Sequence, residues 1–185
     1  MPSRMERRQE RLRRRRREAC AWIVEIAVVF VLAMLVRTFV FSLTTVQGPS
    51  MRETLHSGQI VAVDKLYFSI HDFSRGQVVI CRYPDSDEFY VKRIVGLPGE
   101  TIEIHGGQTY IDGQVLAEDY VLYPPEEDFG PVRIAADEVF VMGDNRANSY
   151  DSRQEGTLPR SMIVGRVMAV CFPFDEARWI EDKPA

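Results

Sequence analysis

Two patterns of apolar residues divide the chain. Between Cys20 and Ser42 apolar residues dominate, and the run from Ile26 to Val36 contains no polar residue. This stretch has the length that a membrane-spanning helix needs, which is ~20 residues. Its flanking charges lie near its ends, where long side chains can reach the lipid headgroups. The pattern therefore predicts a transmembrane anchor over residues 19–42.

Two other structures are compatible with this apolar stretch: a buried helix of a soluble fold and the core of a cleavable signal peptide. A signal peptide would place a small-residue cleavage site after the stretch. No Ala-x-Ala-like sequence follows it, and the apolar run is long for a signal-peptide core. We therefore expect an anchor that stays attached to the domain behind it.

Beyond residue 43, short segments with a period of two residues replace the long apolar run. They predict strands at Gln59–Val63, Gln77–Arg82, Phe89–Val95, Thr101–Ile104, Thr109–Ile111, Glu138–Met142 and Ile163–Phe172. Asp112-Gly113 predicts a two-residue hairpin turn, and residues 119–131 predict a loop. These short strands favour a mainly β, antiparallel domain over residues 43–185, with a small β extension around residues 105–135.

Charge is distributed unevenly along the 185 residues. Residues 1–18 hold nine arginines against three glutamates, whereas the rest of the chain holds 14 Lys and Arg against 24 Asp and Glu. Positive residues that precede a spanning helix stay on the cytoplasmic side. We therefore expect a disordered basic cytoplasmic tail over residues 1–18, a single pass through the cytoplasmic membrane and an extracytoplasmic domain. Membrane lipid is an expected partner of the chain, and nucleic acid is not.

The cysteines and histidines do not suggest a metal site. None of Cys20, Cys81 and Cys171 forms a group with histidine at metal-ligand spacing. A disulfide between Cys81 and Cys171 is possible outside the cell, but both cysteines lie in apolar runs that favour buried free thiols. We expect neither a metal nor a cofactor.

A serine follows a turn shortly after the predicted anchor. Gly48 and Pro49 precede Ser50, and this pair favours a defined turn with close backbone approach. Such a turn can expose a hydroxyl and direct backbone N–H groups at one point, as an oxyanion hole requires. On its own, however, a serine in this setting is more often part of an ordinary turn.

Two further segments carry groups that complement a serine. Lys92 lies in a predicted strand among apolar neighbours, and burial disfavours the charged form of an amine. A neutral lysine can accept the proton of a serine hydroxyl, although a solvated lysine on an edge strand would give the same pattern. The polar run over residues 143–153 fits either a hydrated loop or a scaffold that holds a catalytic group.

Together these three segments resemble the motifs of bacterial type I signal peptidases, the membrane-anchored serine–lysine proteases that remove signal peptides from exported preproteins. The matching sequences are Gly48-Pro49-Ser50-Met51 with Thr54-Leu55, then Tyr90–Gly99, and then Gly143–Arg146 with Asn148-Ser149 and Asp151-Ser152-Arg153. They occur in the family's order behind a predicted anchor, over nearly the whole chain. The resemblance implies a signal-peptidase-like antiparallel β protease domain whose substrates are preprotein signal peptides.

The resemblance also implies a role for each site residue. Ser50 would be the acylating nucleophile and Lys92 the general base, without a metal or cofactor. The supporting residues would be Ser149, Asp151, Arg153, Arg93 and Asp144, and the oxyanion hole and substrate cleft would include Gly48 and Met51. Ser149 would hold the lysine amine toward Ser50.

Three positions depart from the family's common pattern. Glu53 replaces a frequent proline, Ala147 replaces a common aspartate, and Gly48 stands where some members carry a serine. The first two changes make the rigidity of their segments less certain, and the third leaves the oxyanion hole to backbone N–H groups, chiefly that of Ser50. None of them alters the nucleophile or the base, so we expect activity.

Two other functions remain open from the sequence. A self-cleaving Ser-Lys protein of the SOS-repressor type would share the fold, but the predicted anchor and the lack of a DNA-binding domain argue against it. An inactive membrane-tethered binding module would also share the fold, but the presence of both Ser50 and Lys92 argues against that. Cleavage of an added preprotein would separate the peptidase from both.

Overall fold

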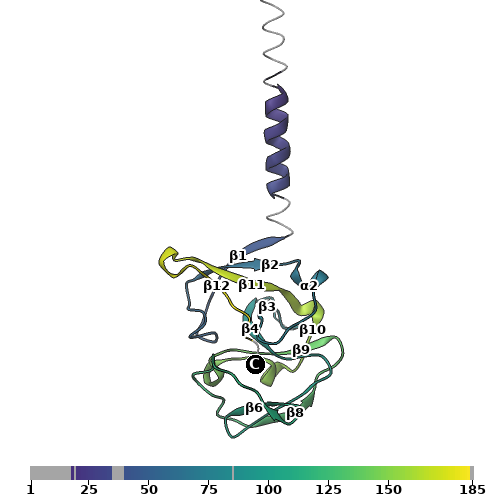
Figure 1. Cartoon of the computed structure of the whole chain (residues 1–185), viewed down its shortest axis with the longest axis vertical. Helices are drawn as coiled ribbons and strands as arrows, with labels where there is room; N and C mark the ends of the chain where they lie inside the picture. The colour runs from purple at the N-terminus through teal and green to yellow at the C-terminus, as the bar shows by residue number, and fades with distance from the viewer. Residues whose placement is uncertain (1–17, 19, 35–39, 85, 184–185) are drawn as a thin grey trace, which may run out of the picture. The chain divides into compact units, whose positions relative to one another are not determined.

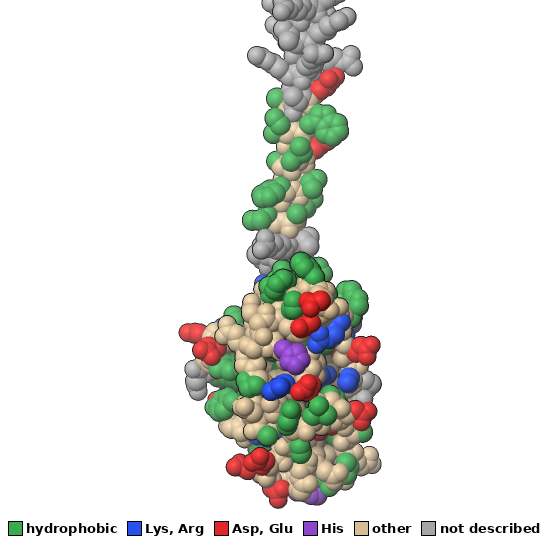
Figure 2. All heavy atoms as spheres, turned by 90° about the vertical axis from the view of Figure 1, so that its left-hand side faces the viewer, with side chains coloured by type: hydrophobic (Ala, Val, Ile, Leu, Met, Phe, Trp, Pro, Cys, Tyr) green, Lys and Arg blue, Asp and Glu red, His purple; other side chains and the backbone are tan. Residues whose placement is uncertain are grey.

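The computed structural model describes residues 18, 20–34, 40–84 and 86–183 (Figure 1). The chain divides into two units, Met1–Val40 and Phe41–Ala185. In the first unit, residues 20–34 are helical and expose large apolar side chains, which Figure 2 shows along the helix. Residues 1–17, 19 and 35–39, which make up most of the predicted tail and part of the predicted anchor, lie outside the described residues.

A helix that crosses a bilayer must be both long and apolar. None of the helices in the described part of the chain is both long enough and apolar enough to cross a membrane.

The second unit is built on a main antiparallel sheet with the strand order β1-β2-β11-β3-β4-β9-β10, and β12 pairs with β11. Its strands are β1 (Phe41–Thr45), β2 (Ile60–Asp64), β3 (Val78–Cys81), β4 (Tyr90–Gly96), β9 (Glu138–Met142), β10 (Leu158–Pro159), β11 (Ile163–Phe172) and β12 (Arg178–Trp179). Short helical turns join them: α2 (Tyr67–Ile70), η1 (Arg146–Asn148), α3 (Ser152–Glu155), η2 (Arg160–Met162) and η3 (Phe174–Glu176). The predicted mainly β, antiparallel class is therefore confirmed.

A second, four-stranded antiparallel sheet has the order β7-β6-β5-β8. Its strands are β5 (Thr101–His105), β6 (Gln108–Ile111), β7 (Gln114–Val115) and β8 (Phe129–Arg133). Asp112 and Gly113 both have positive φ between β6 and β7, as the predicted hairpin turn requires. This sheet lies where a small β extension was expected.

Of the twelve strands in the described residues, seven agree with the sequence predictions, and β1, β7, β8, β10 and β12 were not predicted. The first strand, β1, begins at Phe41, inside the stretch predicted as anchor. The last strand of the small sheet, β8, overlaps the predicted loop over residues 119–131, so that prediction is wrong at its end. Gly130-Pro131 signals a turn in the sequence, yet here it lies on an edge strand, where proline is tolerated because its missing N–H needs no partner.

Three clusters of buried apolar side chains hold the unit together. One packs Val46, Met51 and Leu55 against strands β2, β3 and β11, and a second lies around β3, β4 and β9. The third joins the two sheets, because Phe140 of β9 packs with Ile102 and Ile104 of β5. This third cluster fixes the small sheet onto the strands that carry the site described below.

Truncating Phe140 tests the joint between the sheets. Phe140→Ala should lower the free energy of unfolding by about 3–5 kcal/mol, because a fully buried ring leaves a cavity. Phe174→Ala is the matched control, since Phe174 is 83% exposed, and it should change that free energy by less than about 0.5 kcal/mol. Urea denaturation measures both variants, and equal losses in the two would contradict this account of the core.

Candidate active site

The three motif segments meet beside the β4–β9 pair. Arg93 of β4 pairs with Met142 of β9, so the loop that follows Met142 lies next to β4. The turn that carries Ser50 is tied to this loop by Asn145. The Asn145 backbone N–H donates to the Ser50 carbonyl oxygen at 3.0 Å, and its side-chain Nδ2 donates to the Pro49 carbonyl oxygen at 3.3 Å. Segments that are distant in the chain therefore share one site.

Lys92 is the buried cation of this site, with only 2% of its surface exposed. Its Nζ donates a hydrogen bond to Ser149 Oγ at 3.1 Å. Burial lowers the pKa of Lys92 below its ordinary value, and the charge of Asp151 opposes that shift only in part. At a given pH, a larger fraction of this amine is neutral than for a lysine in solvent.

Gly143 brings Ser50 and Ser149 close together. A Cβ at position 143 would clash with both Ser149 Oγ and the Ser50 carbonyl oxygen, so only glycine permits this approach. Among the hydrogen bonds of the described residues, none joins the Ser50 hydroxyl directly to the Lys92 amine. The link between the two residues is indirect. Gly143 lies against both the Ser50 carbonyl oxygen and the Ser149 hydroxyl, and this hydroxyl accepts a hydrogen bond from Lys92.

Asp151 holds the loop that positions Ser149. Its carboxylate pairs with Arg153 Nε at 2.9 Å, accepts the Gly143 N–H at 3.1 Å and caps α3. Arg153 Nη2 also donates to the Ser149 carbonyl oxygen at 3.2 Å. Burial by itself would raise the pKa of Asp151, but the hydrogen bond and charge of Arg153, with the nearby Ser149 hydroxyl and Gly143 N–H, bring it below its ordinary value. The carboxylate is therefore ionised and engaged by these groups.

A second ion pair, between Arg93 and Asp144, is fully buried. Arg93 Nε and Nη2 donate to the two Asp144 oxygens at 2.8 and 2.7 Å, a bidentate arrangement. The guanidinium also lies over the Tyr120 ring, 4.3 Å from its centroid. Thr54 Oγ1 donates to Asp144 at 2.5 Å and accepts from Arg93 at 3.3 Å. This pair therefore fixes the chain four residues beyond Ser50.

Gly48 and Met51 flank Ser50 in different settings. Gly48 has a φ of +82°, which favours glycine, in the turn before the serine. Met51 is 1% exposed and packs with Val46 and Leu55 in the core. Met51 therefore supports the turn from the core, and its expected contribution to the substrate cleft stays a prediction.

A cavity of about 380 Å³ opens beside Ser50. Its lining residues come from the end of β1, from the turn and from the start of β4, and they are Thr44, Thr45, Gln47, Ser50, Glu88, Phe89, Tyr90 and Val91. Ser50 is only partly buried, so an elongated molecule between these two strands can reach it.

Several structural members of the site were not singled out from the sequence. Asn145 and Thr54 lie within the motifs, but their contacts depend on the fold. Arg146 is buried and donates to both oxygens of Glu118, at 2.8 and 2.5 Å, which fixes the loop after β9 to the segment before Tyr120. No local pattern signals this pair, because its members are 28 residues apart.

The two departures from the family's side-chain pattern lie at the surface. Ala147 is exposed on η1, and Glu53 is exposed and pairs with Arg52 at 3.4 Å. Neither side chain is part of the buried network around Lys92. The presence of Ala147 and Glu53 in place of the family's common residues therefore removes no contact from that network.

The cysteines of the domain, Cys81 and Cys171, are unpaired thiols. Cys81 is fully buried, as predicted, whereas Cys171 is half-buried, so the prediction of a buried thiol is wrong there. Burial raises the pKa of the Cys81 thiol to about 12, so it is uncharged beside Lys92. Within the described ranges, no group of three or more His, Cys, Asp or Glu side chains is arranged to hold a metal ion.

Comparison with known proteins gives consistent matches. A profile of the family described as "Signal peptidase, peptidase S26" matches residues 19–172. Signal peptidase I of Bacillus amyloliquefaciens is 41% identical over 168 residues, which cover 85% of this chain and 90% of the relative. Signal peptidase I S of Bacillus subtilis (strain 168) is 39% identical over 169 residues, covering 85% and 91%. The crystal structure of a signal peptidase I from Enterococcus faecalis V583 is 29% identical with a TM-score of 0.48, covering 52% of this chain and 97% of that one.

Replacing Arg93 tests the buried ion pair. Arg93→Met should lower the free energy of unfolding by about 3–5 kcal/mol, because Asp144 would remain buried without its cation. Arg52→Met removes an exposed pair and should lower it by less than about 1 kcal/mol. Chemical denaturation of both variants gives the comparison, and a neutral Arg93→Met would rule out this role for the pair.

Proposed function

The chain belongs to the signal peptidase family, peptidase S26, and on this premise we propose that it is a membrane-bound endopeptidase that cleaves N-terminal signal peptides from exported preproteins, with Ser50 as nucleophile and Lys92 as general base. Membership makes the chain a peptidase, a hydrolase. Its substrate, its dyad and its attachment to the membrane are the content of the proposal.

The environment of Lys92 is the observation that carries the proposal. Its amine is buried, has a lowered pKa and donates to a hydroxyl. A carboxylate in the place of the Ser149 hydroxyl would favour the protonated amine instead. Since Gly143 brings this hydroxyl against the main chain of Ser50, a neutral Lys92 is well suited to take the proton of Ser50.

In the proposed reaction, Lys92 accepts the proton of the Ser50 hydroxyl as Oγ attacks the scissile carbonyl carbon. Lys92 then passes this proton to the leaving amine, and the signal peptide remains as an ester on Ser50. Water, losing a proton to Lys92, hydrolyses the ester and restores the enzyme. Ser149 keeps the amine oriented throughout, because its hydroxyl accepts one amine hydrogen.

The oxyanion is proposed to bind backbone N–H groups, chiefly that of Ser50. Asn145 Nδ2 holds the Pro49 carbonyl oxygen. The C=O and N–H of one trans peptide point in opposite directions, so this bond directs the Ser50 N–H away from Asn145. Gly48 supplies the backbone turn that makes this orientation accessible.

The substrate is proposed to bind as an extended segment. The cavity beside Ser50 lies between the end of β1 and the start of β4, and β1 is an edge strand of the main sheet. An edge strand can accept an added strand through main-chain hydrogen bonds. The shallow polar wall at Thr44 and Thr45 suits the small residues of an Ala-x-Ala type sequence.

Membrane attachment is proposed through residues 19–42, with residues 1–18 cytoplasmic and residues 43–185 outside. The apolar side chains of helical residues 20–34 support this. Phe172, Phe174 and Trp179 expose a second apolar surface on the domain, and aromatic side chains favour the lipid–water interface. Lipid is therefore a proposed partner, and no nucleic-acid partner is proposed for the acidic domain.

Loss of either proposed catalytic group should abolish cleavage of a preprotein. Ser50→Ala removes the nucleophile and Lys92→Met removes the base, so each should lower kcat at least about a thousandfold. Lys65→Met, at a lysine outside the site, should retain activity. Gel analysis of a preprotein mixed with each detergent-solubilised variant measures this, and an active Ser50→Ala enzyme would refute the proposed nucleophile.

The pH dependence of kcat should follow the neutral fraction of Lys92. Below the pKa of Lys92, kcat should rise about tenfold per pH unit and then level off above that pKa, because only the unprotonated amine accepts a proton. The inflection should lie below the 10.5 of an ordinary lysine, because burial lowers this pKa. A profile centred near about 6.5, together with full activity of Lys92→Met, would indicate a histidine base instead.

A further inference from the structure

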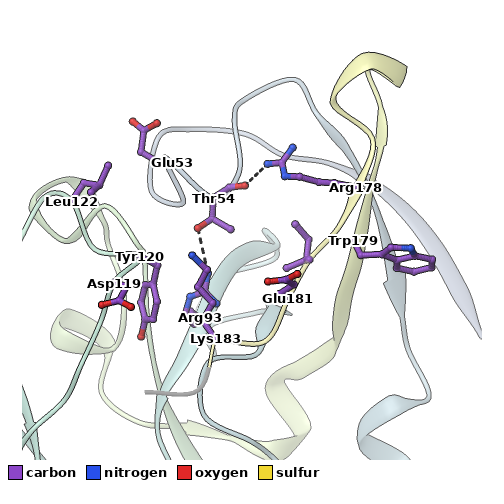
Figure 3. A pocket seen from close by; sticks show the side chains of 11 residues that line it. Glu53, Thr54, Arg93, Asp119, Tyr120, Leu122, Arg178, Trp179, Glu181 and Lys183 are labelled. Atoms are coloured by element: carbon purple, nitrogen blue, oxygen red, sulfur yellow. Dashed lines mark hydrogen bonds between the residues drawn. The ribbon is translucent and has the colours of Figure 1, made fainter.

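A second cavity, of about 690 Å³, is lined in part by Glu53 and Thr54, which follow Ser50 in the chain (Figure 3). Its walls come from three segments: residues 53–54, residues 119–122 and residues 178–183, with Arg93 at its base. It is larger than the cavity beside Ser50, and the proposed reaction makes no use of it. Its lining mixes charges of both signs with apolar residues such as Leu122 and Ile180.

This cavity is in contact with the chain that carries the nucleophile. Thr54, four residues beyond Ser50, accepts from Arg93 through its hydroxyl and from Arg178 through its carbonyl oxygen, the latter at 2.7 Å (Figure 3). Lys92 and Arg93 are consecutive in β4, so their side chains point to opposite faces of the strand. The segment from Ser50 to Thr54 therefore passes from the face of Lys92 to the face of Arg93.

Several charges of this cavity have no ionic partner within the described part of the chain. Asp119 and Glu181 are exposed and take part in none of its salt bridges, and the same holds for Arg178 and Lys183. Arg178 instead donates to two backbone carbonyl oxygens. Charges of both signs beside the exposed Leu122 match the mixed chemistry of a polypeptide segment better than that of a single ion.

We propose that this cavity is an exosite for the part of the preprotein that follows the scissile bond. The inference rests on the proposed peptidase function. In the proposed binding mode the cavity beside Ser50 holds one side of the substrate between β1 and β4, and Arg52 and Glu53 offer a path for the other side. Those residues are exposed and lead to Thr54, which lines the second cavity. A downstream segment of the substrate can therefore follow the nucleophile segment into it.

The length of the substrate beyond the cleavage site tests this exosite. Two substrates would share one signal-peptide sequence and differ in ending about 3 or about 15 residues after the scissile bond. The longer one should have a KM about fivefold lower, the gain expected of a few exposed polar contacts. The variant Asp119→Arg/Glu181→Arg should reduce that advantage to less than about twofold, with kcat on the short substrate unchanged.

A matched charge reversal controls for net charge. Glu126→Arg/Glu127→Arg changes the same number of exposed carboxylates at positions that line neither cavity, and it should keep the fivefold advantage. Equal KM values for the two substrates in the unmodified chain, or an advantage that survives in Asp119→Arg/Glu181→Arg, would overturn the exosite alone. Absence of cleavage of both substrates would overturn the peptidase proposal as well.

Discussion

Burial of the Lys92 amine is the constraint around which the site is arranged. A buried amine favours its neutral form only while no carboxylate is free to pair with it. The acid whose charge acts most strongly on the amine, Asp151, is held by Arg153 and by the Gly143 N–H, and the direct partner of the amine is the Ser149 hydroxyl. Arg153 and the Gly143 N–H thus engage the Asp151 carboxylate, and the uncharged Ser149 hydroxyl orients the amine.

The two aspartates of the loop after β9 have distinct tasks. Asp151 holds the segment that carries Ser149, whereas Asp144, bound to Arg93, holds Thr54 of the nucleophile segment. A buried pair of this kind is rarely a large net source of stability, because removing two charges from water is costly. Its value here is geometric, since a bidentate guanidinium fixes the relative position of three chain segments.

The sequence pattern predicts the strands that bury apolar side chains, as β3 and β9 do at nearly every position. It fails at β1, whose residues are exposed or half-buried throughout, and at β8, where Gly130-Pro131 imitates a turn. The motif resemblance leads to Ser50, Lys92 and Ser149, because these residues lie in recognisable segments. It cannot lead to the Arg146–Glu118 pair or to the burial of Met51, since both depend on how distant segments pack.

The alternation of side chains along β4 connects the chemistry to its support. Lys92 faces Ser149, while its neighbour Arg93 faces Asp144 and the second cavity. Because the side-chain period of a strand is two, a one-residue change of register would exchange these residues and place a permanently charged guanidinium where the amine with the lowered pKa now lies. The pairing of β4 with β3 and β9 therefore places Arg93 against Asp144 and Lys92 against the uncharged Ser149 hydroxyl. The lysine and the arginine thus occupy consecutive positions without sharing a hydrogen-bond partner.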